Sequence, residues 1–183
     1  MKTLWDNLFR KNTPEYHIQS LLKETILFKD LNERELLLVY KIMHPRNFRS
    51  GEEIFKQGDR GVGMYLIANG SVNIFLEENL EKQETKKSFI TRLERGDFFG
   101  ESALVIDGGF RSATVIARED CNLLSFLYPD LKEIIEQFPK TGVKILMRLG
   151  EVLGTRLRET NKKIISFISE IDSLKNELNN RGS

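Results

Sequence analysis

The stretch "FFGESALVIDGGFRSATV", residues 98–115, is the most informative part of this chain. It places Gly100 and Glu101 ahead of two more glycines and Arg111. The glycines are too frequent for a regular helix, so the stretch predicts the end of a strand followed by one short helical turn. Gly100 permits a backbone geometry that a side chain would block, and the amides that follow it can then point inward together. Amides arranged in this way form an anion site.

Arg111 is predicted to return to the same place from the next strand, because Gly108 and Gly109 let the loop fold over. The planar guanidinium group matches the oxygens of a phosphate. A carboxylate at Glu101 would repel an anion unless it accepts hydrogen bonds from hydroxyls of the same ligand, or holds the arginine in place. A phosphate joined to a sugar hydroxyl satisfies both demands, and the segment therefore predicts a sugar phosphate site.

The surrounding sequence predicts an all-β body between two helical segments. Residues 46–128 contain short apolar runs separated by turn sequences roughly every 8–12 residues, which is the pattern of a barrel or sandwich. The charged residues 77–87 are interpreted as a solvated hairpin tip. Residues 1–45 are predicted to be an N-terminal helical segment, in which Asn32 and Glu35 have the spacing of a capping box.

Residues 129–183 predict a return to helix, with a short element closed by Pro139 and one long helix over 140–179. At about 1.5 Å per residue this helix is roughly 60 Å long, more than the domain can cover. Apolar residues in its second half recur three and four apart, the coiled-coil spacing, which predicts a homodimer through this helix. Three glycines weaken the first half and are predicted to let it bend or rotate. They are Gly142, Gly150 and Gly154.

Composition narrows the class of protein. The 183 residues are 40% hydrophobic and 30% charged, as in a soluble globular protein. With 28 Lys and Arg against 27 Asp and Glu the net charge is +1, which gives no indication of a nucleic-acid partner. No apolar run is long enough for a signal peptide or a membrane span, and the single Cys121 permits no internal disulfide. We therefore expect a cytoplasmic protein with no membrane partner.

The sequence does not predict an enzyme. His17 and His44 lie outside the predicted barrel, so the barrel has no histidine cluster for a metal and no Ser/His or Cys/His pair. No catalytic residue, metal or cofactor is expected.

Residues 96–115 resemble the phosphate-binding cassette of the cyclic nucleotide-binding domain family, and residues 54–75 resemble the glycine-marked strands that precede it there. The similarity covers residues 18–170 and is greatest to the catabolite activator branch. It implies a jelly-roll β-barrel with N-terminal helices and a long C-terminal dimerisation helix, which binds cAMP or cGMP and signals to an unidentified partner protein. Phe110 stands where many relatives have proline.

The resemblance also implies roles for individual residues. Glu101 would accept the ribose 2′-hydroxyl, Arg111 would pair with the cyclic phosphate, and Ser112 would donate its hydroxyl to a phosphate oxygen. Backbone amides would assist near Gly100, Ser102 and Ala103. On the base side, the positions that correspond to purine contacts are Ile90, Thr91, Thr160 and Asn161.

Other interpretations stay open. Glu101 and Arg111 are also consistent with a structural salt bridge in a ligand-free dimerising scaffold of the same fold. Catabolite activators continue into a DNA-reading helix-turn-helix, whereas this sequence ends at Ser183, so DNA binding is not expected; a sensor part of a longer transcription regulator is the third alternative. A hydroxyl after the arginine favours guanine in some relatives, whereas the catabolite activator resemblance favours cAMP. Arg156 and its basic neighbours are interpreted as a solvated helix face.

Overall fold

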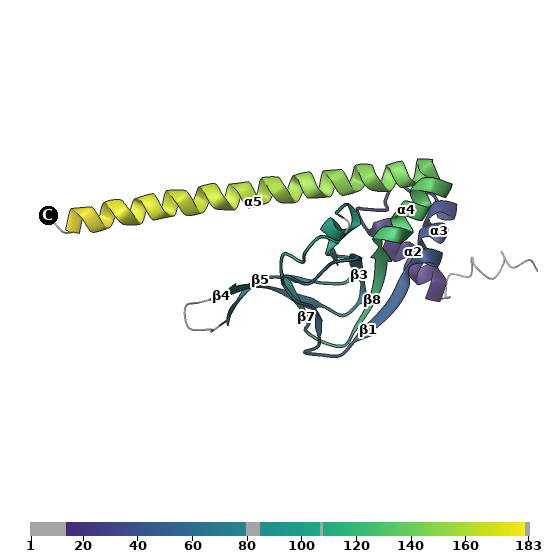
Figure 1. Ribbon diagram of the computed structural model, residues 1–183, viewed down its shortest axis with the longest axis horizontal. Coiled ribbons are helices and arrows are strands. Elements are labelled where there is room, and N and C mark those ends of the chain that lie inside the picture. Colours follow the sequence, from purple (N-terminus) through teal and green to yellow (C-terminus); the bar gives the residue numbers. More distant parts are fainter. Residues whose placement is uncertain (1–13, 80–84, 107, 182–183) are drawn as a thin grey trace, which may run out of the picture.

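The computed structural model describes residues 14–79, 85–106 and 108–181, which form two sheets flanked by helices (Figure 1). The N-terminal helices are α2 (Pro14–Glu24) and α3 (Glu33–Ile42). The capping box predicted at the start of α3 is confirmed, since Glu35 N donates to Asn32 Oδ1 and Asn32 N donates to Glu35 Oε2. Residues 1–13 of the predicted N-terminal segment lie outside the described residues.

In the described residues, eight strands form two four-stranded antiparallel sheets. The order is β1-β8-β3-β6 in the first sheet and β2-β7-β4-β5 in the second. The jelly-roll prediction is confirmed, with one correction: the described strands form two separate sheets and not a closed barrel, because the edge strands do not pair across the gap. The strands are β1 (His44–Phe48), β2 (Glu53–Phe55), β3 (Gly63–Asn69), β4 (Val72–Asn79), β5 (Thr85–Leu93), β6 (Phe98–Phe99), β7 (Thr114–Ala117) and β8 (Cys121–Leu127).

Side chains that alternate along β3 and β8 build two hydrophobic cores, one on each face of the first sheet. Leu66 and Phe126 face the helices and join a core that includes Phe28 and Leu149. Ile67 and its neighbours face the second sheet, where the core residues come from both sheets. The molecule therefore has three layers, with helices on one side of the first sheet and the second sheet on the other.

Strands β4 and β5 form a hairpin at the predicted place, but residues 77–79 and 85–87 of the predicted solvated tip are paired strand residues, and residues 80–84 lie outside the described residues. The register changes within the hairpin, because Ile74 pairs with Thr91 and Phe75 pairs with Phe89. Ile90 is thus the extra residue of a β-bulge, and its side chain is exposed.

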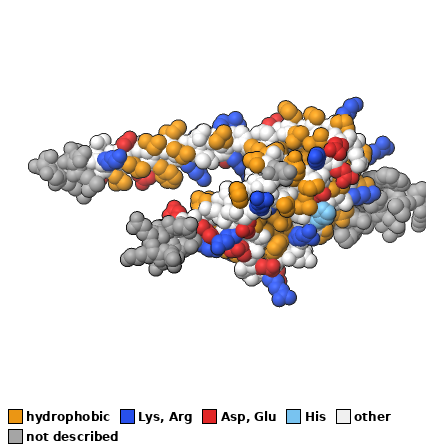
Figure 2. Space-filling view, viewed as in Figure 1, with side chains coloured by type: hydrophobic (Ala, Val, Ile, Leu, Met, Phe, Trp, Pro, Cys, Tyr) orange, Lys and Arg blue, Asp and Glu red, His pale blue; other side chains and the backbone are white. Residues whose placement is uncertain are grey.

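The C-terminal part comprises α4 (Tyr128–Gln137) and the long α5 (Pro139–Arg181), which projects beyond the sheets (Figure 1). The first part of α5 is buried at Ile145, Leu149 and Val152. From Thr155 to Glu177 its side chains are exposed, and hydrophobic ones lie along the projecting part (Figure 2). No helix in the described part of the chain is both long and apolar enough for a membrane span.

Gly142 has a different role from the predicted bend, since α5 continues through it without interruption. A Cβ at Gly142 would lie 2.7 Å from Ile135 Cγ1 and 2.9 Å from Ile135 Cα, both on α4. The glycine therefore lets α4 and α5 pack closely.

Candidate functional site

The predicted turn after β6 is present and depends on Gly100. This residue has φ +75°, in the left-handed region, and the 3-10 helix η1 (Glu101–Leu104) follows it. A Cβ at Gly100 would collide with the Arg111 guanidinium group. A glycine is therefore required here both by the backbone conformation and by the close approach of the arginine.

Arg111 is buried, with only 7% of its surface exposed. Its NH1 donates to Gly100 O at 3.2 Å, and its guanidinium carbon lies 4.1 Å from the ring centroid of Phe55. Its Nε is buried and has no hydrogen-bond partner among the described residues. Burial lowers the pKa of the guanidinium group, although Tyr65 and two nearby carboxylates act in the opposite direction. A buried cation with an unused donor is a group arranged for an anion.

Glu101 is equally buried, at 7% exposure, but its partner is not Arg111. Its Oε1 lies 2.5 Å from NH1 of Arg156 on α5, and Arg156 NH2 donates to Phe98 O at 3.1 Å. The alternative of a structural salt bridge between Glu101 and Arg111 is therefore not what the described structure shows. Arg156 is exposed, as interpreted from the sequence, but it also pairs with this carboxylate because α5 crosses the edge of the sheets beside η1.

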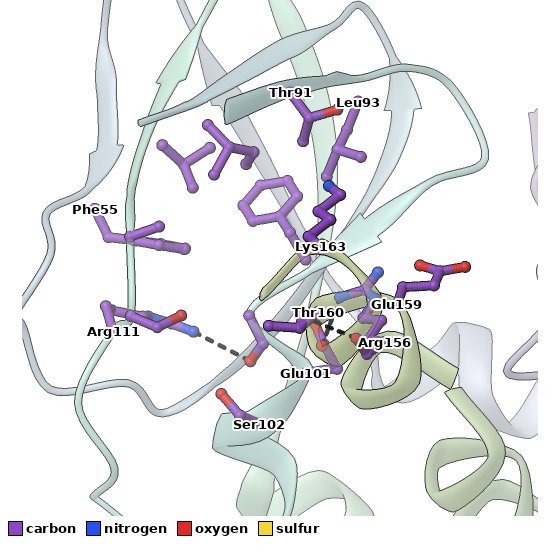
Figure 3. Close-up of a pocket in the computed structure, with 16 residues that line it drawn as sticks. Phe55, Thr91, Leu93, Glu101, Ser102, Arg111, Arg156, Glu159, Thr160 and Lys163 are labelled. Carbon is purple, nitrogen blue, oxygen red and sulfur yellow. Dashed lines mark hydrogen bonds and ion pairs between the residues drawn. The ribbon is translucent and has the colours of Figure 1, made fainter. Parts of the chain in front are cut away.

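These groups lie around a cavity of about 340 Å³ between the sheets and α5 (Figure 3). We call it the central cavity. Figure 3 shows Arg111 and Phe55 on one side, with Glu101 and the α5 residues Arg156 and Thr160 on another. The predicted site residues that line it are Gly100, Glu101, Ser102, Arg111, Ser112, Thr91 and Thr160.

Three predicted site residues are not among those that line the central cavity. Ala103 is buried, and its amide already donates to Gly100 O at 3.2 Å. Ile90 is the exposed bulge residue, and Asn161 is exposed on α5. Of each predicted pair only one member, Thr91 or Thr160, lines the cavity.

Two groups of lining residues were not predicted. One group is apolar and comes from both sheets. The other is polar and lies on α5, on the same side of the cavity as Thr160. A spacing of three, four and seven residues on one helix face was the available signal for the polar group. The apolar group is Phe55, Ile74, Leu93, Phe99, Ala113 and Val115, and the polar group is Arg156, Glu159 and Lys163.

The site offers ligand-binding groups but no metal centre. Within residues 14–79, 85–106 and 108–181 there is no group of three or more His, Cys, Asp or Glu side chains placed to hold a metal ion.

Comparisons with known proteins agree with this geometry. The cyclic AMP receptor protein of Thermus thermophilus is 34% identical over 143 residues, which is 78% of this chain and 62% of that protein. The crystal structure of the Thermus thermophilus catabolite activator protein has a TM-score of 0.67 and 31% identity, over 76% of this chain and 62% of that one. The cAMP-bound PfPKA-R structure has a TM-score of 0.56 and 31% identity, over 66% of this chain and 41% of that one.

The chain spans less than two thirds of the length of the curated relatives that it matches. The family model of the cyclic nucleotide-binding domain matches residues 45–138, just over half of the chain. The matched part contains both sheets apart from His44 of β1, and it includes the Gly100 turn and Arg111. This chain therefore belongs to the cyclic nucleotide-binding domain family.

Proposed function

We propose that this chain is a receptor for a cyclic nucleotide, with cAMP preferred to cGMP, and that binding changes the position of α5. The observation that carries the proposal is the buried Arg111, whose Nε is unpartnered beside the central cavity. Leaving a buried donor unsatisfied costs about 1–3 kcal/mol, and a ligand phosphate removes that cost. The volume of about 340 Å³ lies in the range of small-molecule sites.

The cavity offers a group for each part of such a ligand. The cyclic phosphate is placed at Arg111 with the hydroxyl of Ser112, and the ribose 2′-hydroxyl at Glu101. The purine is placed between the apolar residues of the sheets and Thr160 on α5. Micromolar binding requires about 8 kcal/mol, and a hydrogen bond to a charged group gives roughly 1.5–3 kcal/mol, so several of these contacts must act together.

A ligand in this cavity contacts both the sheets and α5, and it therefore favours one helix position over another. The contact between Glu101 and Arg156 joins the two parts in the structure. A ribose hydroxyl on Glu101 competes for the same carboxylate, so binding changes how α5 is held. The altered helix is then recognised by a partner protein.

The exposed second part of α5 is proposed to pair with a second copy of the chain. Its apolar side chains have no cover in the described structure, and their spacing is that of a coiled coil. They are Leu157, Ile164, Ile165, Phe167, Ile168, Ile171 and Leu174.

The preference for cAMP is supported by two relatives, which are named as a cyclic AMP receptor protein and a cAMP-activated regulator. Another relative is named as a cGMP-dependent protein kinase, of which this chain matches only 14%. The names of the first two describe regulators, which supports a receptor without catalytic activity.

Isothermal titration calorimetry of the full chain with cAMP and with cGMP tests the proposal. We expect saturable heat with cAMP at micromolar concentrations and weaker binding of cGMP. Adenosine is the matched control, because it has the base and ribose but no phosphate, and we expect it to bind much more weakly. Absence of heat with both cyclic nucleotides up to millimolar concentration would leave the ligand-free dimeriser as the better account.

A further inference from the structure

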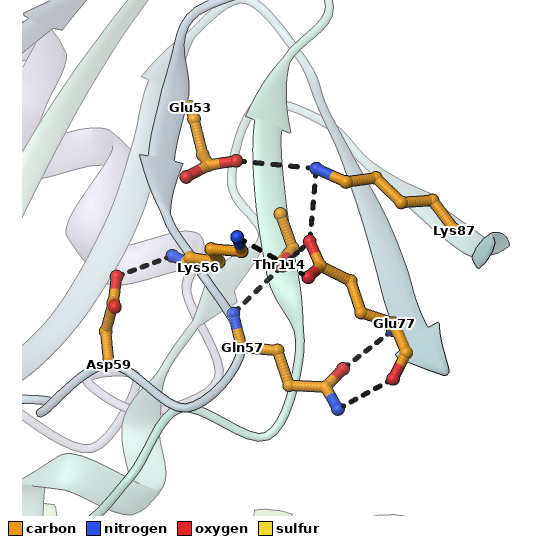
Figure 4. Close-up of polar contacts among 7 residues, drawn as sticks. All are labelled: Glu53, Lys56, Gln57, Asp59, Glu77, Lys87 and Thr114. Carbon is orange, nitrogen blue, oxygen red and sulfur yellow. Dashed lines mark hydrogen bonds and ion pairs between the residues drawn. The ribbon is translucent and has the colours of Figure 1, made fainter. Parts of the chain in front are cut away.

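A polar cluster of the buried Thr114 and the partly buried Gln57 and Glu77 lies where β4, β7 and residues 56–59 meet (Figure 4). We propose that Thr114, together with Gln57 and Glu77, positions Arg111 for the phosphate, although none of the three lines the central cavity. The inference rests on the proposed function for its effect on ligand affinity. Its structural part, that the cluster fixes the arginine, is independent of any ligand.

Thr114 is the first residue of β7 and is fully buried, at 0% exposure. Its hydroxyl accepts a hydrogen bond from Gln57 N at 2.9 Å and donates one to Glu77 Oε1 at 2.8 Å. One hydroxyl group thus joins three segments of chain. Valine has nearly the same shape but supplies neither bond, whereas serine supplies both.

The Gln57 side chain makes a second connection to β4. Its Nε2 donates to Glu77 O at 3.1 Å, and its Oε1 accepts from Glu77 N at 2.8 Å. The backbone pairing of β4 with β7 ends at Phe75 and Thr114. Beyond that point the Gln57 side chain takes the place of a strand and bonds to the backbone of Glu77. Residue 57 is held on both its backbone and its side chain.

Residues 56–59, in turn, hold both backbone groups of Arg111. Gly58 N donates to Arg111 O at 2.9 Å, and Arg111 N donates to Asp59 O at 2.8 Å. Lys56 N donates to Asp59 Oδ2 at 2.8 Å, which closes the turn. Arg111 precedes β7 by three residues, so its backbone position is set by this turn and not by the β4–β7 ladder.

Phe55 stands directly before the same turn, and its ring lies under the Arg111 guanidinium group. The turn therefore fixes the arginine at its backbone and at its charged end. Recognition of a phosphate by the guanidinium fork requires accurate orientation, and small displacements of a binding group have large effects. Losing the Thr114 hydroxyl releases Gln57 and, through the turn, Arg111.

The cluster is expected to survive loss of this hydroxyl without unfolding. Glu77 keeps Lys87 at 3.1 Å and Lys56 at 3.9 Å, so its carboxylate is not left without a cation. The Thr114→Val substitution is therefore a local perturbation and a suitable test.

The experiment compares Thr114→Val with Thr114→Ser in two measurements. In the ligand-free protein, hydrogen exchange of the Arg111 amide is expected to become about tenfold faster in Thr114→Val and to stay near wild type in Thr114→Ser. In calorimetry, the dissociation constant for cAMP is expected to rise about tenfold in Thr114→Val only. In an Arg111→Ala background, Thr114→Val is expected to have no further effect on affinity.

Thr25→Val is the matched control, because Thr25 is also a buried threonine, whose hydroxyl donates to Leu21 O at 2.9 Å and has no bond to the cluster or to the Arg111 turn. It should leave both the Arg111 amide and the cAMP affinity unchanged. If Thr114→Val does not fold, Gln57→Met is the second variant: it removes both side-chain bonds of residue 57 to β4 at similar side-chain length and should give the same two changes.

Two results would overturn the inference. One is wild-type exchange of the Arg111 amide in Thr114→Val. The other is faster exchange with unchanged cAMP affinity in a protein whose wild type binds. If the wild type binds no cyclic nucleotide, the proposed function fails, and the exchange data still decide whether the cluster fixes Arg111.

Discussion

The first part of α5, residues 139–154, and its second part, residues 155–177, differ in what covers their apolar side chains. The first part is held by the same chain: Ile145 and Leu149 are buried in the main core, and Lys144 and Arg148 form ion pairs with residues in and near α3. In the second part, large apolar side chains from Leu157 to Leu174 are 49–67% exposed. The central cavity lies at the border between the two. A ligand in the central cavity would therefore contact α5 at the boundary between its buried part and the part that we propose pairs with a second copy.

The largest effect is expected from removing apolar side chains of the second part. Replacing both Ile164 and Ile171 with serine should prevent dimer formation, because each buried isoleucine contributes about 1.5–3 kcal/mol and two copies contribute. Sedimentation analysis of the purified protein measures this. The control replaces the exposed residues Lys162 and Glu177, which lie on the helix face away from these isoleucines, with serine. If the isoleucine variant remains dimeric, the second part of α5 is not the interface.

A substitution in the first part should act on folding instead. Ile145→Ala removes a fully buried side chain and is expected to lower the free energy of unfolding by about 2–5 kcal/mol, as measured by urea denaturation. Ile168→Ala, made in the monomeric variant, should change it little because Ile168 is exposed. Equal losses for the two substitutions would contradict the division of α5 into two parts.

The ion pair that anchors α5 to α3 should be pH-dependent. Lys144 Nζ lies 2.7 Å from Glu35 Oε2, and Thr141 Oγ1 donates to Glu35 Oε1. Burial would raise the pKa of Glu35, but these hydrogen bonds and that of Asn32 N outweigh it and hold the pKa below its ordinary 4.5. The stabilisation is therefore complete above that ordinary value and is lost as pH falls through the lowered pKa of the folded state.

Glu35→Gln tests this anchor. Near neutral pH it should lower the free energy of unfolding by about 1.5–3 kcal/mol, and the difference from wild type should shrink in acid, below the ordinary pKa of the carboxyl. Urea denaturation at a series of pH values measures both. A difference that stays constant into acid would mean that the carboxylate charge does not anchor α5.

The smallest effects come from two glycines of the same helix. A Cβ at Gly150 meets nothing within 4 Å, so Gly150→Ala should stabilise the fold by up to about 1 kcal/mol through helix propensity. A Cβ at Gly142 meets Ile135 at 2.7 Å, so Gly142→Ala should destabilise it by about 1–3 kcal/mol. Thermal unfolding distinguishes the two signs. Stabilisation by both substitutions would show that α4 and α5 are not closely packed at Gly142.

Local signals in the sequence predicted the elements of this fold. Asn32 and Glu35 cap α3 by bonding to each other's backbone amides, and Gly100 has the left-handed conformation that few other residues adopt. The length of α5 followed from an unbroken helical period. Each of these features is decided by residues close together in the chain, which is why sequence alone was sufficient.

The contacts of the site were less predictable, because they depend on how α5 crosses the sheets. The pairing of Glu101 with Arg156 joins residues 55 positions apart, and no local pattern distinguishes Arg156 from other basic residues of the helix. The bulge at Ile90 and the inward position of Thr91 depend on the β4–β5 register. The position of the turn and of its arginine was therefore predictable, whereas of the predicted pairs, Ile90 with Thr91 and Thr160 with Asn161, only Thr91 and Thr160 line the cavity.

The most direct test of the central claim is the affinity of cAMP for the wild type and for Arg111→Ala, measured by calorimetry. Arg118→Ala, at an exposed position after β7, is the control. If the buried arginine binds the cyclic phosphate, Arg111→Ala should weaken binding on the order of 100-fold while Arg118→Ala binds as the wild type does. Equal affinity for all three proteins would place the ligand elsewhere and contradict the account.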